Sequence, residues 1–359
     1  MQIHFRKTFY IFACVAALLA LIYLGKPILI TMTMALLSSF ILYPICSRLE
    51  RWGLSRVVAA LATLITIIGL TLGVFYLFST QIISLMSEFT DFEHKLVTLF
   101  ESVVNFINNR VALVPDINST DIIDSTQEWV EESGGDIMTN TFNRTAALLS
   151  GVLAVTVYTF LLLIYRSGLK NVAVSAASLP NQEKTAKMLG EIQKVGQHYL
   201  VGMSIMIGIL GTANSLILLV FGIDHAFFFG FLAALLAIIP YVGTTLGALI
   251  PVLYALMTHS SYWIPLGVML AFWFIQLIES NYLSPKIVGG NLNINALAAI
   301  ISLIVGGYLW GVAGMILFLP MTAILKVICG YFDDLKPVSM LLGNSLYEQD
   351  GLTQGKSKN

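Results

Sequence analysis

The sequence predicts an all-α polytopic membrane protein, a helix bundle with about eight transmembrane segments. Of its 359 residues, 57% are hydrophobic and only 11% are charged, whereas soluble domains carry about 25% charged residues. The apolar residues also form long blocks, and helices satisfy every backbone amide inside lipid. We therefore expect a transmembrane domain over residues 1–332 and a polar, loose cytoplasmic tail over 333–359.

Six apolar runs have the length of an ordinary membrane span, since about 20 residues cross a hydrocarbon core of about 30 Å. They cover residues 9–24, 28–45, 57–79, 146–165, 199–221 and 262–279. The first run could be a signal peptide, but no small-residue cleavage site follows it. Gly25, Lys26 and Pro27 instead separate it from the second run, which favours a helical hairpin.

Two later blocks, 226–258 and 294–327, are too long for one ordinary span. Each would measure roughly 50 Å as a straight helix, so it must tilt steeply, break, or turn back as a re-entrant hairpin. If both blocks cross, the polar stretch 280–293 faces outward; if both turn back, it faces the cytoplasm. A straight crossing would exceed the usual tilt of about 0–40°, so we expect hairpins.

Basic residues indicate the orientation of the chain. Lys and Arg gather in segments 47–56 and 166–198, whereas the loop 80–143 is acidic. Because basic loops stay in the cytoplasm, we expect the first two segments inside, the acidic loop outside, and both termini cytoplasmic.

The outer loop also carries an apolar stripe with alternating spacings of four and three residues, which indicates one face of a helix. The stripe comprises Leu85, Phe89, Phe92, Leu96, Leu99, Val103 and Phe106. It packs either against a second outer helix of the same chain, residues 121–142, or against another subunit.

Enzyme signatures are absent from the sequence, which has no HExxH, GxSxG or GxxxxGK[ST] motif. We therefore expect no enzyme, and transport would draw on an ion gradient, the membrane potential or the solute's own gradient. Cys14, Cys46 and Cys329 are far apart and lack the spacing of metal ligands. We expect no cofactor or metal, and the sequence lacks the basic tract that nucleic-acid binding needs.

Proline and glycine interrupt both overlong blocks. The residues are Pro240, Tyr241, Gly243, Gly247 and Pro251 in the first block, and Gly311, Gly314 and Pro320 in the second. Proline leaves a helical carbonyl without its usual partner, and such carbonyls are tolerated at membrane depth only against protein or a wet cavity. These residues form either broken helices that line a transport path or kinked helices packed closely through small residues.

A polar cluster lies between the two blocks. Asn281, Pro285 and Gly289 are further candidates for the substrate path or its gating, and Glu279 and Lys286 are candidates for ion coupling. A carboxylate that faces lipid costs several kcal/mol, so Glu279 needs a wet or paired environment. Two interpretations remain open. Glu279 is an interfacial carboxylate paired with Lys286, or it couples transport to protons or cations.

The C-terminal half also carries two longer motifs. These are IIPYVGTTLGALIP and NYLSPKIVGGNLNINALAAIISLIVGGYLWGVAGMILFLPMTAILKVI. The first resembles the Pro-x-x-Gly segment of the autoinducer-2 exporter family of bacterial permease-like proteins. The second is similar to that family's run of Asn, Pro, basic residue and Gly, followed by a Gly-rich helix and Pro. The resemblance covers nearly the whole chain.

This resemblance implies a bacterial inner-membrane protein that assembles into homo-oligomers. Members of the family are described as exporters of the signal autoinducer-2, while some relatives look like sodium/proton antiporters. Our first hypothesis is therefore a secondary exporter or facilitator of a small solute, surrounded by membrane lipid. A cation/proton antiporter and a non-transporting membrane scaffold are the alternatives.

Overall fold

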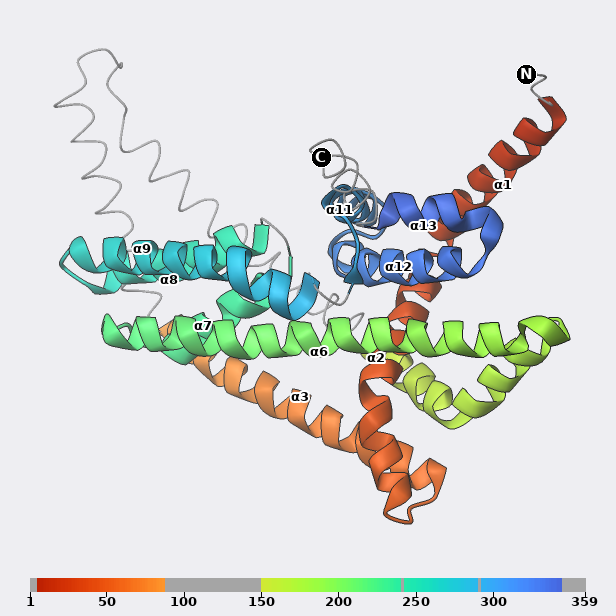
Figure 1. Ribbon diagram of the computed structural model, residues 1–359. Coiled ribbons are helices and arrows are strands. Elements are labelled where there is room, and N and C mark those ends of the chain that lie inside the picture. The colour runs from red at the N-terminus through yellow and green to blue at the C-terminus, as the bar shows by residue number, and fades with distance from the viewer. Residues whose placement is uncertain (1–4, 88–149, 240–241, 290–291, 344–359) are drawn as a thin grey trace, which may run out of the picture.

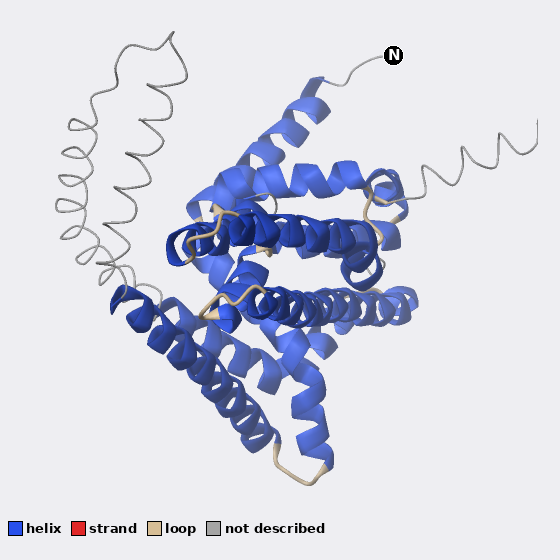
Figure 2. Ribbon diagram, turned by 90° about the vertical axis from the view of Figure 1, so that its left-hand side faces the viewer, coloured by secondary structure: helices blue, strands red, loops and turns tan. Residues whose placement is uncertain are grey.

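A computed structural model of the protein describes residues 5–87, 150–239, 242–289 and 292–343, which fold as helices joined by short loops (Figures 1 and 2). The first part contains α1 (Phe5–Leu24), α2 (Lys26–Arg51) and α3 (Arg56–Ser87), and the helix Ser150–Ser175 follows. Next come η1 (Leu179–Asn181), α6 (Gln182–Val220), α7 (Ala226–Leu236), α8 (Val242–Thr258) and α9 (Trp263–Ile278). The chain continues with η2 (Glu279–Leu283), η3 (Pro285–Gly289), α11 (Ala296–Trp310), α12 (Val312–Tyr331), η4 (Asp333–Leu335) and α13 (Lys336–Leu342).

Within the described residues, six helical stretches are long and apolar enough to cross a membrane. They are Lys26–Arg51, Arg56–Leu85, Ser150–Ser175, Leu179–Val220, Trp263–Val288 and Val312–Tyr331. Three further apolar helices, α7, α8 and α11, have 11, 17 and 15 residues, fewer than the roughly 20 that a crossing requires. The predicted all-α membrane bundle is thereby confirmed, including its two broken segments.

Helix α6 is the longest described element, with 39 residues and no proline, and it runs across the whole bundle in Figure 1. It ends where Gly222 adopts a positive φ of 72°, a conformation that costs glycine little. The amide of Ile223 then donates to the carbonyl of Leu218 at 3.0 Å, which satisfies a terminal carbonyl of the helix.

The first overlong block folds as an antiparallel hairpin of α7 and α8. A methyl group on Gly247 would lie 2.9 Å from Cα of Ala233, and one on Gly243 would overlap the carbonyl of Leu236. This carbonyl, which Pro240 was expected to leave free, accepts a hydrogen bond from the amide of Ile239 at 2.8 Å.

The second overlong block folds in the same way from α11 and α12. It turns at Gly311, whose φ is 62°. A methyl group on Gly306 would lie only 2.5 Å from the carbonyl oxygen of Gly314. At the open end, Lys326 Nζ donates to the carbonyl of Asn293 at 2.6 Å. Both overlong blocks therefore turn back on themselves, as the hairpin interpretation expected.

Both hairpins pack on α6. Leu218 of α6 shares a buried cluster with residues of the first hairpin and of α9, and Ser215 touches Gly230 of α7. Tyr199 and Leu210 of α6 share another cluster with Ala323 of α12. Figure 1 accordingly shows α7, α8 and α9 along one half of α6 and α12 beside the other half.

The polar stretch between the hairpins lies beside the N-terminal half of α6. A methyl group on Gly202 would meet the carbonyl oxygen of Ile287 at 2.7 Å. Leu292 and Asn293 line one cleft together with Lys194 of α6. If α6 begins in the cytoplasm, as the basic residues lead us to expect, the described residues 280–289 should lie toward the same side.

Helix α2 holds the rest of the bundle together. One buried cluster joins α2 to α3 and to the helix Ser150–Ser175, and another joins it to α11 and α12. The indole Nε1 of Trp310 donates to the carbonyl of Ile22 at 3.1 Å, which attaches α1 to the tip of the second hairpin.

Three expectations need comment. The helical hairpin expected of residues 9–24 and 28–45 is wrong, because α1 leads into α2 without folding back: the amide of Gly25 donates to the carbonyl of Leu21 at 2.8 Å and its carbonyl accepts from the amide of Leu29 at 2.9 Å, which continues the helical hydrogen bonding across the junction.

The expectation of a loose tail was wrong for residues 333–343, because α13 folds back and Asn295 Nδ2 donates to the carbonyls of Leu341 and Gly343 at 2.6 and 3.0 Å. Of the apolar stripe in the outer loop, only Leu85 lies in the described part, where it packs against the first-hairpin cluster. The remaining stripe residues, 89–106, lie outside the described residues.

Replacing Gly314 by alanine should destabilise the protein, since the added methyl group overlaps the backbone of Gly306. Overpacking of this kind typically costs about 1–3 kcal/mol, so the thermal unfolding temperature in detergent should fall. Gly208→Ala is the matched control, because a methyl group there meets no other atom within 4 Å. Equal unfolding temperatures for the two variants would contradict the close helix contact.

The double-hairpin fold also predicts the membrane side of residues 280–293. In a chain lacking Cys14, Cys46 and Cys329, Lys286→Cys should react with an impermeant maleimide only after the cells are permeabilised. Ser260→Cys, in the exposed loop between α8 and α9, should react in intact cells and serves as the control. Strong labelling of Lys286→Cys in intact cells would rule out the double hairpin.

Candidate functional site

The proline and glycine residues expected to line a path shape the two hairpins. Gly243 and Gly247 lie in close contact with the backbone of α7, and Gly314 lies in close contact with the backbone of α11. Pro251 and Pro320 are fully buried inside α8 and α12. Gly311 forms the tip of the second hairpin, while Pro240 and Tyr241 lie outside the described residues. A role for these residues in lining the path stays a prediction.

Glu279 is half-buried where α9 gives way to two π-helical turns, η2 and η3, the second of which spans Pro285–Gly289. Its carboxylate accepts hydrogen bonds from Gln276 Nε2 and from Ser284 Oγ, the latter at 3.0 Å. Lys286 is exposed, and no ion pair joins it to Glu279 within the described residues. The expected pairing with Lys286 is thus replaced by two neutral partners.

Asn281 is exposed and uses its side chain locally, since Nδ2 donates to the carbonyl of Leu277 at 2.8 Å. The described residues contain no group of His, Cys, Asp and Glu that could hold a metal ion. The polar stretch therefore presents a carboxylate with neutral neighbours and no metal-ligand set in the part of the chain that the structure describes.

Asn214, in the apolar part of α6, is a functional candidate that the sequence analysis missed. Its side chain is only 6% exposed, and its Oδ1 has no hydrogen-bond partner among the described residues. Leu210 and Leu218, one turn away on either side, belong to the two clusters that join α6 to the hairpins. Leaving a buried acceptor unsatisfied costs about 1–3 kcal/mol, which points to a function for this oxygen. A lone amide in the apolar run 199–221 was the available signal.

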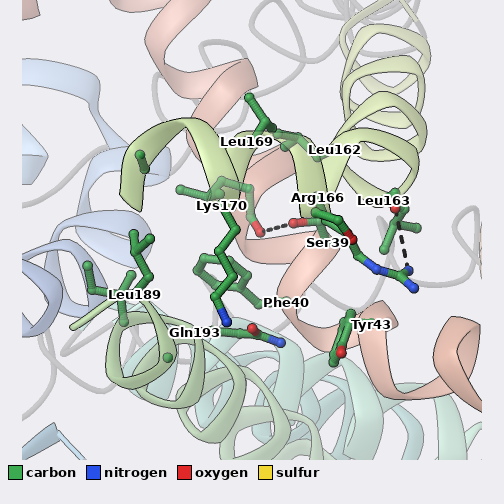
Figure 3. A pocket seen from close by; sticks show the side chains of 15 residues that line it. Ser39, Phe40, Tyr43, Leu162, Leu163, Arg166, Leu169, Lys170, Leu189 and Gln193 are labelled. Carbon is green, nitrogen blue, oxygen red and sulfur yellow. Dashed lines mark hydrogen bonds between the residues drawn. The ribbon is translucent and has the colours of Figure 1, made fainter. Parts of the chain in front are cut away.

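A cavity of about 470 Å³ opens between α2, the helix Ser150–Ser175 and the N-terminal part of α6 (Figure 3). Its volume falls within the range of about 300–1,000 Å³ that small-molecule sites occupy. Leucines, isoleucine and Phe40 form most of the wall. The polar lining groups include Ser39, Tyr43, Arg166, Lys170 and Gln193, and Figure 3 shows Lys170 extending across the cavity toward Gln193.

The charge of Arg166 is already compensated. Its guanidinium forms an ion pair with Glu50 and lies 4.9 Å from the centre of the Tyr43 ring. It also donates to the carbonyl of Leu163 at 3.4 Å. Lys170 has no ion-pair partner within the described residues. The cavity therefore offers apolar walls, hydroxyl and amide groups, and one uncompensated positive charge.

The comparison with known proteins agrees with this architecture. Residues 12–333 match the AI-2E family of transporters. The AI-2 transport protein TqsA of Escherichia coli is 26% identical over 84% of this chain and 85% of its own length. The putative transport protein YhhT of Escherichia coli is 25% identical over 88% of both chains. The putative transport protein YrrI of Bacillus subtilis is 36% identical, over 37% of both chains. With its polytopic helical bundle and this match over most of its length, the chain belongs to the AI-2E family of bacterial transporters.

Proposed function

We propose that the protein is a secondary exporter of a small polar solute that passes along α6 between the two hairpins. The observation that carries this proposal is the packing of both hairpins on that one helix. The helices α7, α8 and α11 have 11, 17 and 15 residues, which is shorter than a full crossing. Discontinuous segments at corresponding positions of a chain surround the substrate site in many secondary transporters.

Asn214 supports this path. Its Oδ1, which has no partner among the described residues, lies on α6 between a cluster with the first hairpin and a cluster that contains residues of both hairpins. At membrane depth such an acceptor is best explained by a solute, an ion or water that binds it during transport.

The cavity beside α2 supports the solute class and the direction. It lies next to Leu189–Gln193 of α6, in the segment that the basic residues assign to the cytoplasm, so an exported solute would bind there first. Its hydroxyl and amide groups, together with the ammonium of Lys170, which has no ion-pair partner in the part of the chain that the structure describes, suit a small hydroxylated molecule, neutral or weakly anionic. TqsA, named as an AI-2 transport protein, makes an autoinducer-2-like molecule the first solute to test.

Glu279 favours a second candidate, a cation/proton antiporter. Its carboxylate is half-buried at the end of a membrane helix and is held by neutral partners rather than by a cation. A carboxylate in such a place can exchange a proton for a cation. The proposed inner-membrane location, cytoplasmic termini and homo-oligomeric assembly apply to either function.

Replacing Asn214 by leucine should reduce solute flux while leaving the protein folded, because an unpartnered amide gives way to an apolar group. A hydrogen bond worth about 0.5–1.5 kcal/mol corresponds to a roughly two- to tenfold loss of flux at low solute concentration. The measurement is efflux of labelled solute from proteoliposomes, with thermal unfolding as the check on folding. Ser204→Ala, at an exposed position of α6, is the control and should transport normally. Normal flux in Asn214→Leu would refute the proposed path.

Replacing Glu279 by glutamine distinguishes the exporter from the antiporter. If the protein exports a neutral solute, the flux of this variant should stay within a few-fold of the flux of the unaltered protein. An imposed proton gradient should change the flux of both proteins equally. In an antiporter the same variant would lose proton exchange on addition of sodium, measured with a pH-sensitive dye inside the vesicles. That loss would overturn the exporter proposal in favour of the antiporter.

A further inference from the structure

A second cleft, of about 630 Å³, lies at the open end of the second hairpin. It is formed by the N-terminal part of α6, the C-terminal end of α12, the residues Leu292 and Asn293, and α13 with the residues before it. These segments bring together five basic side chains, namely Lys184, Lys194, His198, Lys326 and Lys336. The cleft is separate from the cavity beside α2 and from Asn214.

The two carboxylates of the cleft are already engaged. Asp333 pairs with Lys336 at 2.7 Å; this hydrogen bond, the charge of Lys336 and that of Lys184 lower the pKa of the Asp333 carboxyl. The carboxylate of Glu191 lies beside the hydroxyl of Tyr331. Four lysines thus face two carboxylates, which leaves an excess of positive charge before His198 is considered.

Lys326 is the residue of this basic cluster whose ammonium a backbone carbonyl holds in place. Its ammonium donates to the carbonyl of Asn293 at 2.6 Å, where the backbone of Asn293 adopts a positive φ of 50°. An ammonium group has three donors, and no other hydrogen bond of Lys326 occurs among the described residues. Two donors of an anchored, half-buried cation therefore remain available to an anion.

Exposed apolar side chains occur in the same segment as the lining residues Tyr331, Asp333 and Lys336. Phe332, Leu335, Val338 and Leu341 are 52%, 41%, 39% and 60% exposed. Exposed apolar residues beside lysines are typical of segments that lie at the surface of a membrane. The basic segments also assign this end of α6 to the cytoplasm, whose leaflet carries anionic lipids.

We propose that this cleft binds a phosphate group, and that its source is the headgroup of an anionic phospholipid. A soluble phosphate ester has the same anionic chemistry, but it gains nothing from the exposed apolar residues of the segment 332–341. Because Asn293 and Lys326 close the base of the second hairpin while Lys184 and Lys194 belong to α6, a bound phosphate would tie the hairpin to α6. The lipid would thus stabilise the second hairpin in its place.

The test is thermal unfolding of the full-length protein in a neutral detergent, titrated with dioctanoyl phosphatidylglycerol. Dioctanoyl phosphatidylcholine and glycerol 3-phosphate are titrated in parallel. Lys194→Gln removes one charge from the cleft. Lys187→Gln is the matched control, since Lys187 lies on the same helix, outside the cleft, paired with Glu183 at 2.7 Å.

We expect phosphatidylglycerol to raise the unfolding temperature of the unaltered protein and of Lys187→Gln by several degrees, and phosphatidylcholine to have much less effect. Lys194→Gln should need about fivefold more phosphatidylglycerol for the same shift. A response to glycerol 3-phosphate that Lys194→Gln weakens would support the phosphate site and assign it to soluble esters. Equal responses of the two variants, equal effects of the two lipids, or no response to any anion would overturn the proposal.

Discussion

Close contact between helix backbones at glycine is the interaction on which the whole arrangement depends. Inside lipid there is little hydrophobic force between helices, so small residues must let backbones approach. Gly247 lets α8 reach α7, and Gly306 and Gly314 let α11 reach α12. Without these contacts each block would be an overlong apolar segment. With them, each block folds back so that its two ends lie close together, and the resulting hairpin packs on α6.

Helix α6 turns this packing into a functional arrangement. It supports both hairpins, and it carries Asn214, whose Oδ1 has no partner among the described residues, between two buried clusters. Its N-terminal part contributes to the cavity beside α2 and to the basic cleft. At 39 residues it extends roughly 58 Å, so it reaches beyond the hydrocarbon core. One helix therefore connects the proposed solute path with groups at the membrane surface.

The sequence was sufficient for the features that follow from length and local chemistry. The overlong blocks 226–258 and 294–327 exceed the thickness of a bilayer core, and their glycines and prolines indicate where they turn. Helix ends were less predictable, because α6 begins at Gln182, well before its apolar run, and polar residues continue a helix outside lipid. The meeting of distant segments could not be predicted, such as that of α2 and α6, whose residues Ser39 and Gln193 line one cavity. The π-helical turns after α9 also give Glu279 the partner Ser284 instead of Lys286.

The solute is proposed to pass along α6 between the hairpins. A cysteine in place of Asn214 tests most directly whether water and solute reach this position. The measurement is the reaction of Asn214→Cys with a small water-soluble methanethiosulfonate in proteoliposomes, in a chain lacking Cys14, Cys46 and Cys329. The account predicts that the reagent modifies the thiol, that flux then stops, and that excess solute slows the modification. A thiol that stays unmodified while solute continues to cross would contradict the account.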